Sequence, residues 1–303
     1  MQHRTDAEER VQPLGTKPPK MIGATDDAIS REGLSLVFLA TQPDVSMGLA
    51  KAYLPTGAKI IDLSGAFRLR DGETYSRWYK ERHTAPDLLA EAVYGLPEFY
   101  REAIGGARLV ANPGCYPTAA NLALRPLIEA EAVDRSRGII CDAKSGISGA
   151  GRKPSLKTSF CEVSDNFSAY GVLDHRHVAE VVQNSFIGER EFTFTAHLLP
   201  VERGILETIY VRTHRIQKAV DLLSIYEERY ASEPFVRLYA PGKLPDLRAV
   251  QHTNFCDIGF VFDEESGRAV IVSTIDNLVK GAAGQAIQNM NLMLGFPETE
   301  GLL

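Results

Sequence analysis

The sequence predicts an α/β protein of two domains, a doubly wound parallel sheet followed by an α+β domain whose sheet is mostly antiparallel. Three patterns carry this prediction. Short apolar runs alternate with a helical pattern before residue 112, alternating runs dominate after residue 138, and the chain closes on a helical segment. With 303 residues, 44% of them hydrophobic, the chain is long enough to form two cores.

The N-terminal part contains three apolar runs of strand length. They are LSLVFLA at residues 34–40, KIIDLS at 59–64 and ARLVA at 107–111. Runs that are apolar throughout are typical of parallel strands buried on both faces. A helical pattern with an acidic start, residues 44–54, separates the first two runs. Residues 11–33 hold three prolines and predict an irregular connector.

After residue 138 the pattern becomes that of antiparallel strands. The run GIICDAKSG is followed by FTFTAHLL, ETIYVRT, NFCDIGFVF and RAVIVSTI, and the last two are joined by DEESG, as in a hairpin. The final segment, residues 280–295, has apolar side chains at helical spacing and stops at glycine and proline. It predicts a C-terminal helix.

Composition excludes several classes of function. A net charge of −6 argues against an extended nucleic-acid surface, which needs an excess of basic residues. The chain has no apolar stretch long enough to cross a bilayer. Its four cysteines form no Cys-x-x-Cys pair, so we expect neither a metal site nor disulfides, and a reducing, cytoplasmic compartment.

One cysteine lies in a context that predicts a nucleophile. In ARLVANPGCYPTAANLALRPL, Cys115 follows an apolar strand and Pro-Gly, and Pro117 is a natural first residue of a helix. At a helix N-terminus the partial positive charge favours the thiolate, and free N–H groups can hold an oxyanion. An isolated cysteine is more often a small buried hydrophobe, and we assign that role to Cys141, Cys161 and Cys256.

The segment DHRHVAE supplies candidates for proton transfer. His175 and His177 lie beside Asp174 and Glu180, and their spacing predicts a polar turn or strand. Two alternatives are surface histidines without a catalytic role and, more weakly, a metal site, for which the sequence has no completing cluster.

Two further features are compatible with anion binding. The loop SGISGAGRKPS, residues 145–155, can bring backbone N–H groups against a phosphate, although it lacks the Gly-Lys-Ser/Thr ending of a P-loop and is equally typical of a flexible hinge. Arg68 follows a strand end, where ligands of open sheets gather, and Arg203 is similar. A solvated arginine is the alternative for both.

Several segments together resemble one enzyme family. These are ANPGCYPTAA, IDLSGAFRLRD, EAVYGLPE, DAKSGISGAGRKPS, the HRH segment, HLLPVERGI, NFCDIG and DNLVKGAAGQAIQNMNLMLGFPET. They resemble the N-acetyl-γ-glutamyl-phosphate reductases of arginine biosynthesis, in the aspartate-semialdehyde dehydrogenase superfamily. The resemblance implies a Rossmann-like NADP-binding domain at residues 1–114 and 282–303. It also implies a catalytic and oligomerisation domain at 115–281 and a homo-oligomer, either a dimer or a tetramer.

The resemblance also implies a mechanism and roles for individual residues. Cys115 would attack an acyl phosphate substrate, expel phosphate and leave a thioester, which NADPH reduces to the semialdehyde. His175 is the favoured acid/base, supported by His177. Phosphate would be received by Arg68 and Asn112, and a substrate carboxylate by Arg203. The cofactor would be contacted by Ser148, Gly149, Ala150, Gly151 and Asn277.

The sequence departs from the family pattern at its start. The family opens with a strand and a Gly-x-x-Gly-x-x-Gly turn, which does not occur before residue 34. We therefore expect the nucleotide-binding domain to be N-terminally incomplete by roughly 30 to 40 residues, the size of a leading strand, helix and strand. Arg4 would then approach the 2′-phosphate of NADP. Two alternatives follow: a related aspartate- or lysine-pathway semialdehyde dehydrogenase, and a non-catalytic remnant that cannot bind NADPH.

Overall fold

The computed structural model describes residues 28–151 and 155–303. The N-terminal part contains a parallel sheet of four strands in the order β1-β2-β4-β3. The strands are β1 (Leu36–Leu39), β2 (Lys59–Asp62), β3 (Val93–Tyr94) and β4 (Leu109–Ala111). The three predicted strands are confirmed, and the two-residue β3 adds a fourth.

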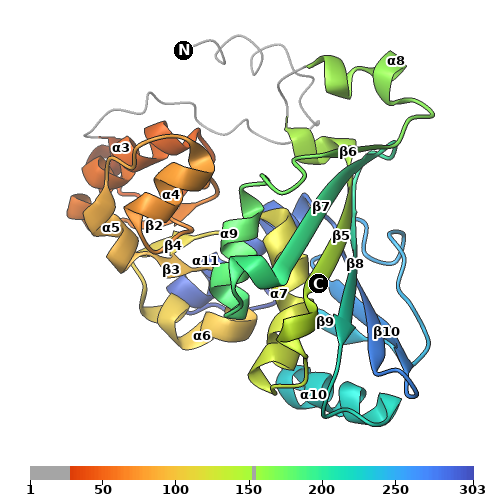
Figure 1. Cartoon of the computed structure of the whole chain (residues 1–303). Coiled ribbons are helices and arrows are strands. Elements are labelled where there is room, and N and C mark those ends of the chain that lie inside the picture. The colour runs from red at the N-terminus through yellow and green to blue at the C-terminus, as the bar shows by residue number, and fades with distance from the viewer. Residues whose placement is uncertain (1–27, 152–154) are drawn as a thin grey trace, which may run out of the picture.

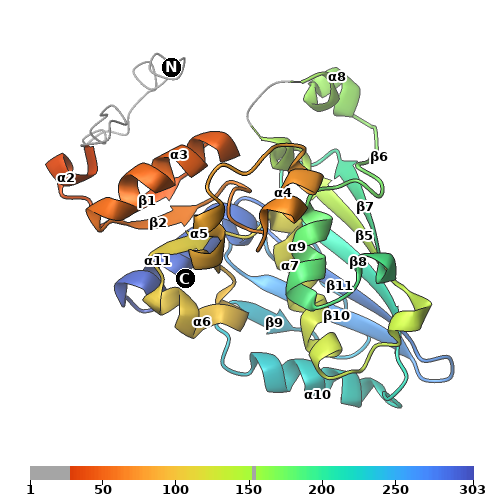
Figure 2. The same ribbon diagram turned by 60° about the vertical axis from the view of Figure 1, so that its left-hand side comes forward.

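Helices cover both faces of this sheet (Figure 2). They are α3 (Pro43–Tyr53), α4 (Gly72–Tyr79), α5 (Pro86–Glu91) and α6 (Pro97–Gly106), with α2 (Ala28–Glu32) and the 3-10 turn η1 (Leu54–Thr56) beside them. Ile60 packs with Phe67 and Tyr75 on one face, while Ile61 and Val110 pack with Ile104 on the other. The predicted helix at 44–54 is confirmed. Within the predicted connector, α2 is helical, and residues 11–27 lie outside the described part.

The second sheet has seven strands in the order β6-β7-β5-β8-β11-β10-β9. Its β5–β7 and β9–β10 pairs are parallel and the others antiparallel, which confirms a mostly antiparallel sheet. The predicted hairpin is also confirmed, because Asp263 pairs with Arg268 at its tip. The strands are β5 (Ile139–Gly146), β6 (Ser168–Tyr170), β7 (Phe192–Leu199), β8 (Ile205–Arg212), β9 (Val236–Leu238), β10 (Cys256–Asp263) and β11 (Arg268–Ile275).

One face of the second sheet is covered by α7 (Cys115–Glu129) and α10 (Ala219–Tyr230) (Figure 1). Tyr226 and Tyr230 of α10 donate hydrogen bonds of 2.5 Å to carbonyls of α7, which fixes the two helices together. The helix α9 (His177–Ser185) lies against α7. Short 3-10 turns complete this part of the chain: η2 (Arg135–Arg137), η3 (Ile147–Ala150), η4 (Leu156–Thr158) and η5 (Glu189–Glu191).

The end of the chain returns to the first sheet. A π-helical turn, Val279–Ala283, leads into α11 (Gly284–Leu294), and Lys59 of β2 donates to the Met293 carbonyl at 2.8 Å. The predicted C-terminal helix is confirmed, although its first turn is π rather than α. Apart from this body, η4 and α8 (Phe160–Val163) project beyond the β6 end of the second sheet (Figures 1 and 2). None of the described helices is both long enough and apolar enough to span a membrane.

Candidate active site

Cys115 is the first residue of α7, and β4 ends four residues before it. This confirms the predicted strand, turn and helix. Glycines on two sides allow close packing there. A Cβ atom on Gly114 would lie 2.7 Å from Nε2 of His177, and one on Gly281 would lie 2.8 Å from Cβ of Cys115. Both glycines are therefore required by close approach rather than by a turn.

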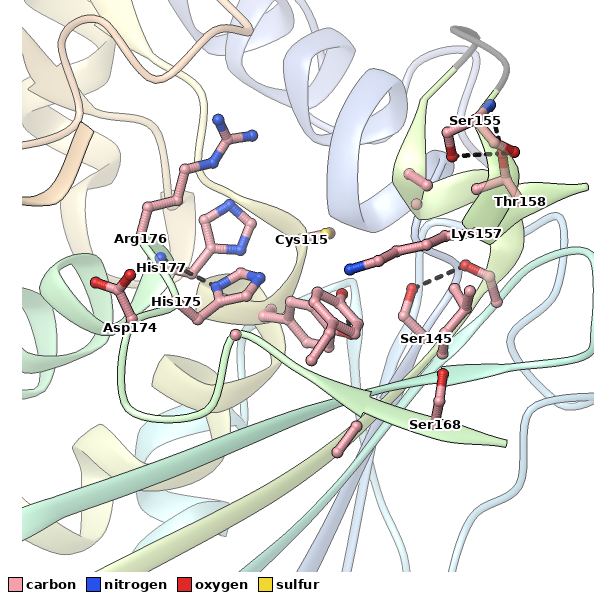
Figure 3. Close-up of a pocket in the computed structure, with 18 of the residues that line it drawn as sticks. Cys115, Ser145, Ser155, Lys157, Thr158, Ser168, Asp174, His175, Arg176 and His177 are labelled. Carbon is pink, nitrogen blue, oxygen red and sulfur yellow. Dashed lines mark hydrogen bonds between the residues drawn. The ribbon is translucent and has the colours of Figure 1, made fainter. Parts of the chain in front are cut away.

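The N-terminus of α7 opens onto a cavity of about 740 Å³. Cys115 and Tyr116 form its inner wall, with His175 and His177 beside them (Figure 3). The opposite wall comes from the loop after β5 and from η4, α8 and β6. The fold thus brings together the cysteine, both histidines and part of the glycine-rich loop, which are far apart in the sequence.

The thiol of Cys115 is not activated by its surroundings in this structure. Burial raises the pKa of Cys115 to about 11, although the Tyr116 N–H and the cation of Arg68 oppose that shift. The Tyr116 N–H at the helix N-terminus favours the thiolate, as expected, but burial outweighs this contribution. Desolvation of a thiolate costs more here than the helix terminus supplies.

The two histidines occupy different positions. His175 is half-buried in a turn, and its Nδ1 accepts from the His177 N–H at 3.3 Å. Contrary to the predicted turn or strand, His177 is buried at the start of α9. Burial, with Arg176 nearby, lowers the pKa of His175 to about 4, and burial lowers the pKa of His177 well below its usual range. Both rings are therefore neutral near pH 7.

Glu180 is a site residue that the sequence analysis did not nominate. It is fully buried, and its carboxylate accepts from the Gly114 N–H and the Tyr94 hydroxyl, each at 3.0 Å. Arg68 pairs with it at 3.3 Å, and Nε2 of His177 lies 3.8 Å away. Its position one helical turn after His177 is the only sequence signal that pointed to it.

Arg68 and Asn112 lie together in the buried layer behind the cavity wall. Arg68 Nε donates to the Asn112 carbonyl at 2.8 Å, and Nη2 donates to the Leu63 carbonyl at 2.9 Å. The Asn112 side chain donates to the Ala282 carbonyl at 3.0 Å. Neither residue is part of the cavity lining. The structure therefore brings the two predicted phosphate ligands together, close to Cys115, with most of their donors already bonded.

The predicted cofactor residues also meet in space. Asn277 donates to the Ser148 hydroxyl at 3.0 Å and accepts from the Gly204 N–H at 2.6 Å. Gly149 and Ala150 line the cavity, and Gly151 has a φ of 82°. A Cβ atom on Gly149 would lie 2.6 Å from the Ser145 hydroxyl, so a side chain there would displace that hydroxyl. Arg4 lies outside the described residues.

Arg203, the predicted ligand of a substrate carboxylate, is paired with residues of the protein. Its guanidinium pairs with Asp276 at 3.2 Å and contacts Nδ1 of His252 at 3.1 Å, outside the cavity lining. The remaining cysteines are also outside that lining. Cys141 and Cys256 are buried in strands, whereas Cys161 is exposed on α8, and all three are free thiols. Within residues 28–151 and 155–303 no group of three or more His, Cys, Asp or Glu side chains could hold a metal ion.

Family models match both parts of the chain. Residues 5–107 match the NAD binding domain of semialdehyde dehydrogenases, and residues 115–277 match the dimerisation domain of the same enzymes. The cysteine at the start of α7 is the first residue of the second match. The chain therefore belongs to the semialdehyde dehydrogenase family.

Curated relatives narrow the family further. The chain is 50% identical over 299 residues to an N-acetyl-gamma-glutamyl-phosphate reductase of Symbiobacterium thermophilum, covering 97% of this chain and 83% of that protein. It is 51% identical over 272 residues to the same enzyme of Nitrosomonas europaea, covering 88% and 78%. Within the semialdehyde dehydrogenases, the chain is a member of the N-acetyl-gamma-glutamyl-phosphate reductase family.

Solved structures agree on the fold. Aspartate semialdehyde dehydrogenase II from Vibrio cholerae, complexed with ASA, superposes with a TM-score of 0.64 at 17% identity, covering 86% of this chain and 79% of that one. The aspartate semialdehyde dehydrogenase from Candida albicans, solved with NADP, gives a TM-score of 0.59 at 14% identity, covering 86% and 77%.

Proposed function

We propose that this protein reduces N-acetyl-L-glutamyl 5-phosphate to N-acetyl-L-glutamate 5-semialdehyde and phosphate with NADPH, in arginine biosynthesis. The observation that carries the proposal is the position of Cys115 at the start of α7, facing a cavity with two histidines on its wall. The relatives at about 50% identity support the choice of substrate.

The chemistry proceeds through a covalent bond to Cys115. Its sulfur attacks the acyl carbon, the bond from that carbon to the phosphate oxygen breaks, and inorganic phosphate leaves behind a thioester. NADPH, when bound, supplies the hydride that converts the thioester to a thiohemiacetal. Loss of the hydroxyl proton then breaks the carbon–sulfur bond, which releases the aldehyde and the cysteine. The N–H groups at the start of α7 can hold the oxyanion during attack.

A histidine must accept the thiol proton and later exchange a proton with the thiohemiacetal oxygen. The sequence favours His175, but the contacts support His177 for this role. His177 abuts Gly114, the residue before the nucleophile, and Glu180 lies beside its ring. A nucleophile, a base and a carboxylate that orients the base form the usual arrangement for this chemistry. His175, whose Nδ1 faces the His177 N–H, supports the first ring.

Binding roles are divided between the two sides of Cys115. Arg68 and Asn112 receive the departing phosphate, and Arg203 is a candidate for a substrate carboxylate. The described residues fit the nicotinamide end of the cofactor, because bare backbone at Gly149 adjoins the cavity and Asn277 is fixed to Ser148. The other proposed contacts of the cofactor are Ala150 and Gly151, together with Arg4, which would approach the 2′-phosphate of NADP.

The domain division extends this proposal. Residues 1–114 and 282–303 form the NADP-binding domain, because α11 packs back on β2, and residues 115–281 form the catalytic and oligomerisation domain. The free thiols support a reducing, cytoplasmic location.

The homo-oligomer forms through the open face of the seven-stranded sheet. Ile140, Tyr210, Val270 and Val261 lie in one register row across four adjacent strands, and three of the four are exposed. A continuous apolar row on an open sheet face needs a partner, and these strands lie within the dimerisation-domain match. The substitution Tyr210→Asp is expected to yield a monomer by light scattering, whereas Val220→Asp, at an exposed position of α10 on the other side of the sheet, leaves the assembly intact.

The test of the proposed reaction is the reverse assay. The purified chain should reduce NADP with N-acetylglutamate 5-semialdehyde only when phosphate is present. Turnover of aspartate semialdehyde instead would select the related dehydrogenase. A folded protein inactive toward both, and unable to bind NADP in calorimetry, would select the non-catalytic alternative.

A further inference from the structure

Lys157 extends over the cavity from the wall opposite Cys115. It belongs to η4 and is exposed, and its side chain lines the cavity. Figure 3 shows its ammonium group pointing inward, toward the side on which Cys115 lies. We propose that Lys157, in place of the candidate Arg203, binds the single carboxylate of the acyl substrate and thereby selects substrates that carry an anionic group away from the reacting carbon. This inference rests on the proposed function.

The other cations that the structure describes near the site have partners of their own. Arg68 pairs with Glu180 at 3.3 Å, Arg203 pairs with Asp276 at 3.2 Å, and Lys80 pairs with Asp174 at 3.4 Å. Arg176 also lines the cavity, and its guanidinium lies over the ring of Tyr79 at 5.6 Å. Lys157, by contrast, forms no ion pair with any residue of the described ranges. A carboxylate entering the cavity meets this cation without displacing an existing partner.

The backbone that carries Lys157 is held in place. The Ser155 N–H donates to the Thr158 hydroxyl at 3.2 Å, and the two hydroxyls are 3.0 Å apart. These bonds close the turn on both sides of Lys157. Only the four-carbon stem of the lysine is then free to adjust, which lets one point charge follow acyl chains that differ slightly in length.

The surroundings also suit a small polar acyl group. Hydroxyls of Ser145, Ser155 and Ser168 face the cavity together with the Tyr170 ring. They offer hydrogen bonds to a carboxylate or an amide, whereas the end nearest Cys115 is enclosed by Tyr116 and the histidines. Glu162 of α8 also lines the wall that carries Lys157, but the Lys157 ammonium is the group that extends toward Cys115. The cavity thus has the nucleophile on one side and a cation on the other, with room for an acyl chain between them.

The experiment compares two aldehydes in the phosphate-dependent reduction of NADP. One is N-acetylglutamate 5-semialdehyde, and the other is 4-acetamidobutanal, which lacks only the carboxylate. We expect Lys157→Met to raise KM for the first aldehyde about tenfold or more, the usual effect of losing a hydrogen bond to a charged group. KM for 4-acetamidobutanal, for phosphate and for NADP should stay within about twofold. Lys157→Arg should retain most of the preference, and Lys80→Met is the matched control.

The outcomes separate this inference from the proposed function. If the wild-type protein does not turn over N-acetylglutamate 5-semialdehyde, the proposed function fails. The assignment of Lys157 is overturned if the wild type is active and the Lys157→Met variant prefers N-acetylglutamate 5-semialdehyde over 4-acetamidobutanal as strongly as the wild type does. If only Arg203→Met loses the preference, the carboxylate binds Arg203 and not Lys157. If Lys157→Met raises only the KM for NADP, Lys157 binds the cofactor and not the substrate.

Discussion

Two buried carboxylates lie on either side of Cys115, and their surroundings differ in one respect. Glu98, behind the π-helical turn, pairs with Lys280 at 2.6 Å, and both side chains are fully buried. Glu180, in front, pairs with Arg68 but also adjoins His177, which lines the cavity. Nδ1 of His177 is buried without a hydrogen-bond partner among the described residues. Oε2 of Glu98 is likewise without a partner among these residues, but neither Glu98 nor Lys280 lines the cavity. The Glu98 centre is thus closed off from a ligand in the cavity, whereas His177 of the Glu180 centre contacts it.

This difference separates a structural centre from a catalytic one. Gln288 closes the Glu98 centre by accepting from Lys280 at 2.7 Å and donating to Glu98 at 3.3 Å, which joins α6, the π-helical turn and α11. Burial alone would raise the pKa of Glu98, but Lys280 reverses that effect and lowers it. At the other centre, a proton can move between the histidine and a ligand. Variants on the two sides should therefore fail in different ways.

The largest effect is expected for the nucleophile between the two centres. Cys115→Ala should lower kcat by at least about 10⁴-fold, since no other group can form the thioester. The melting temperature should change little, because only one sulfur atom is removed. Steady-state kinetics and thermal unfolding measure both. Residual activity near the wild-type level would refute the covalent route.

The next effect concerns the base. His177→Asn should lower kcat by about 10² to 10⁴-fold, the range for loss of a positioned acid/base. His175→Asn is the matched variant and should cost about tenfold or less, because it removes only a supporting contact. The opposite ranking of the two variants would restore His175 as the acid/base.

The two carboxylates themselves give the direct comparison. Glu180→Gln should lower kcat about ten- to a hundredfold, since Arg68 and the Gly114 N–H lose a charged partner. Lys280→Met should instead lower the free energy of unfolding by about 3 to 5 kcal/mol, because it leaves Glu98 buried and unpaired. Addition of Glu98→Gln to Lys280→Met should recover part of that stability. If Glu180→Gln and Lys280→Met lowered kcat by similar factors, the distinction between a catalytic and a structural centre would be wrong.

The smallest effect is a pH dependence. Because burial raises the pKa of Cys115 to about 11, alkylation of Cys115 by iodoacetamide in the ligand-free protein should still accelerate between pH 8 and about 9.5. A Cys161→Ser background removes the exposed thiol from the assay. A rate that reaches its plateau below pH 8 would show that the thiolate is already stabilised.

The sequence was most informative where structure is local. The run at 192–199 coincides with β7, where burial alternates over the first six residues, and the run at 268–275 coincides with β11, although the last five residues of β11 are all buried. The placement of Cys115 was also predictable, since strand, Pro-Gly turn and helix start are contiguous. Strands of two or three residues, such as β3 and β6, are too short to show any period.

What could not be predicted depends on contacts distant in sequence. Glu180 acquires its role only because α9 packs where β2 and β4 end, beside Arg68 and Gly114. Arg68 was correctly expected near a strand end. Its buried pair with Glu180 could not be predicted, because neither the segment around Arg68 nor the segment around Glu180 shows that the two meet. The raised pKa of Cys115 could not be predicted for the same reason, because the helix terminus is local in sequence and the burial is not.

The central claim is the thioester at Cys115, and intact-mass analysis tests it most directly. The protein is incubated with N-acetylglutamate 5-semialdehyde and NADP in the absence of phosphate, so that hydride transfer can proceed while release by phosphate cannot. The account predicts a mass increase equal to one N-acetylglutamyl group, mapped to Cys115, lost on addition of phosphate and absent from Cys115→Ala. Turnover without any such adduct, or an adduct on another residue, would contradict it.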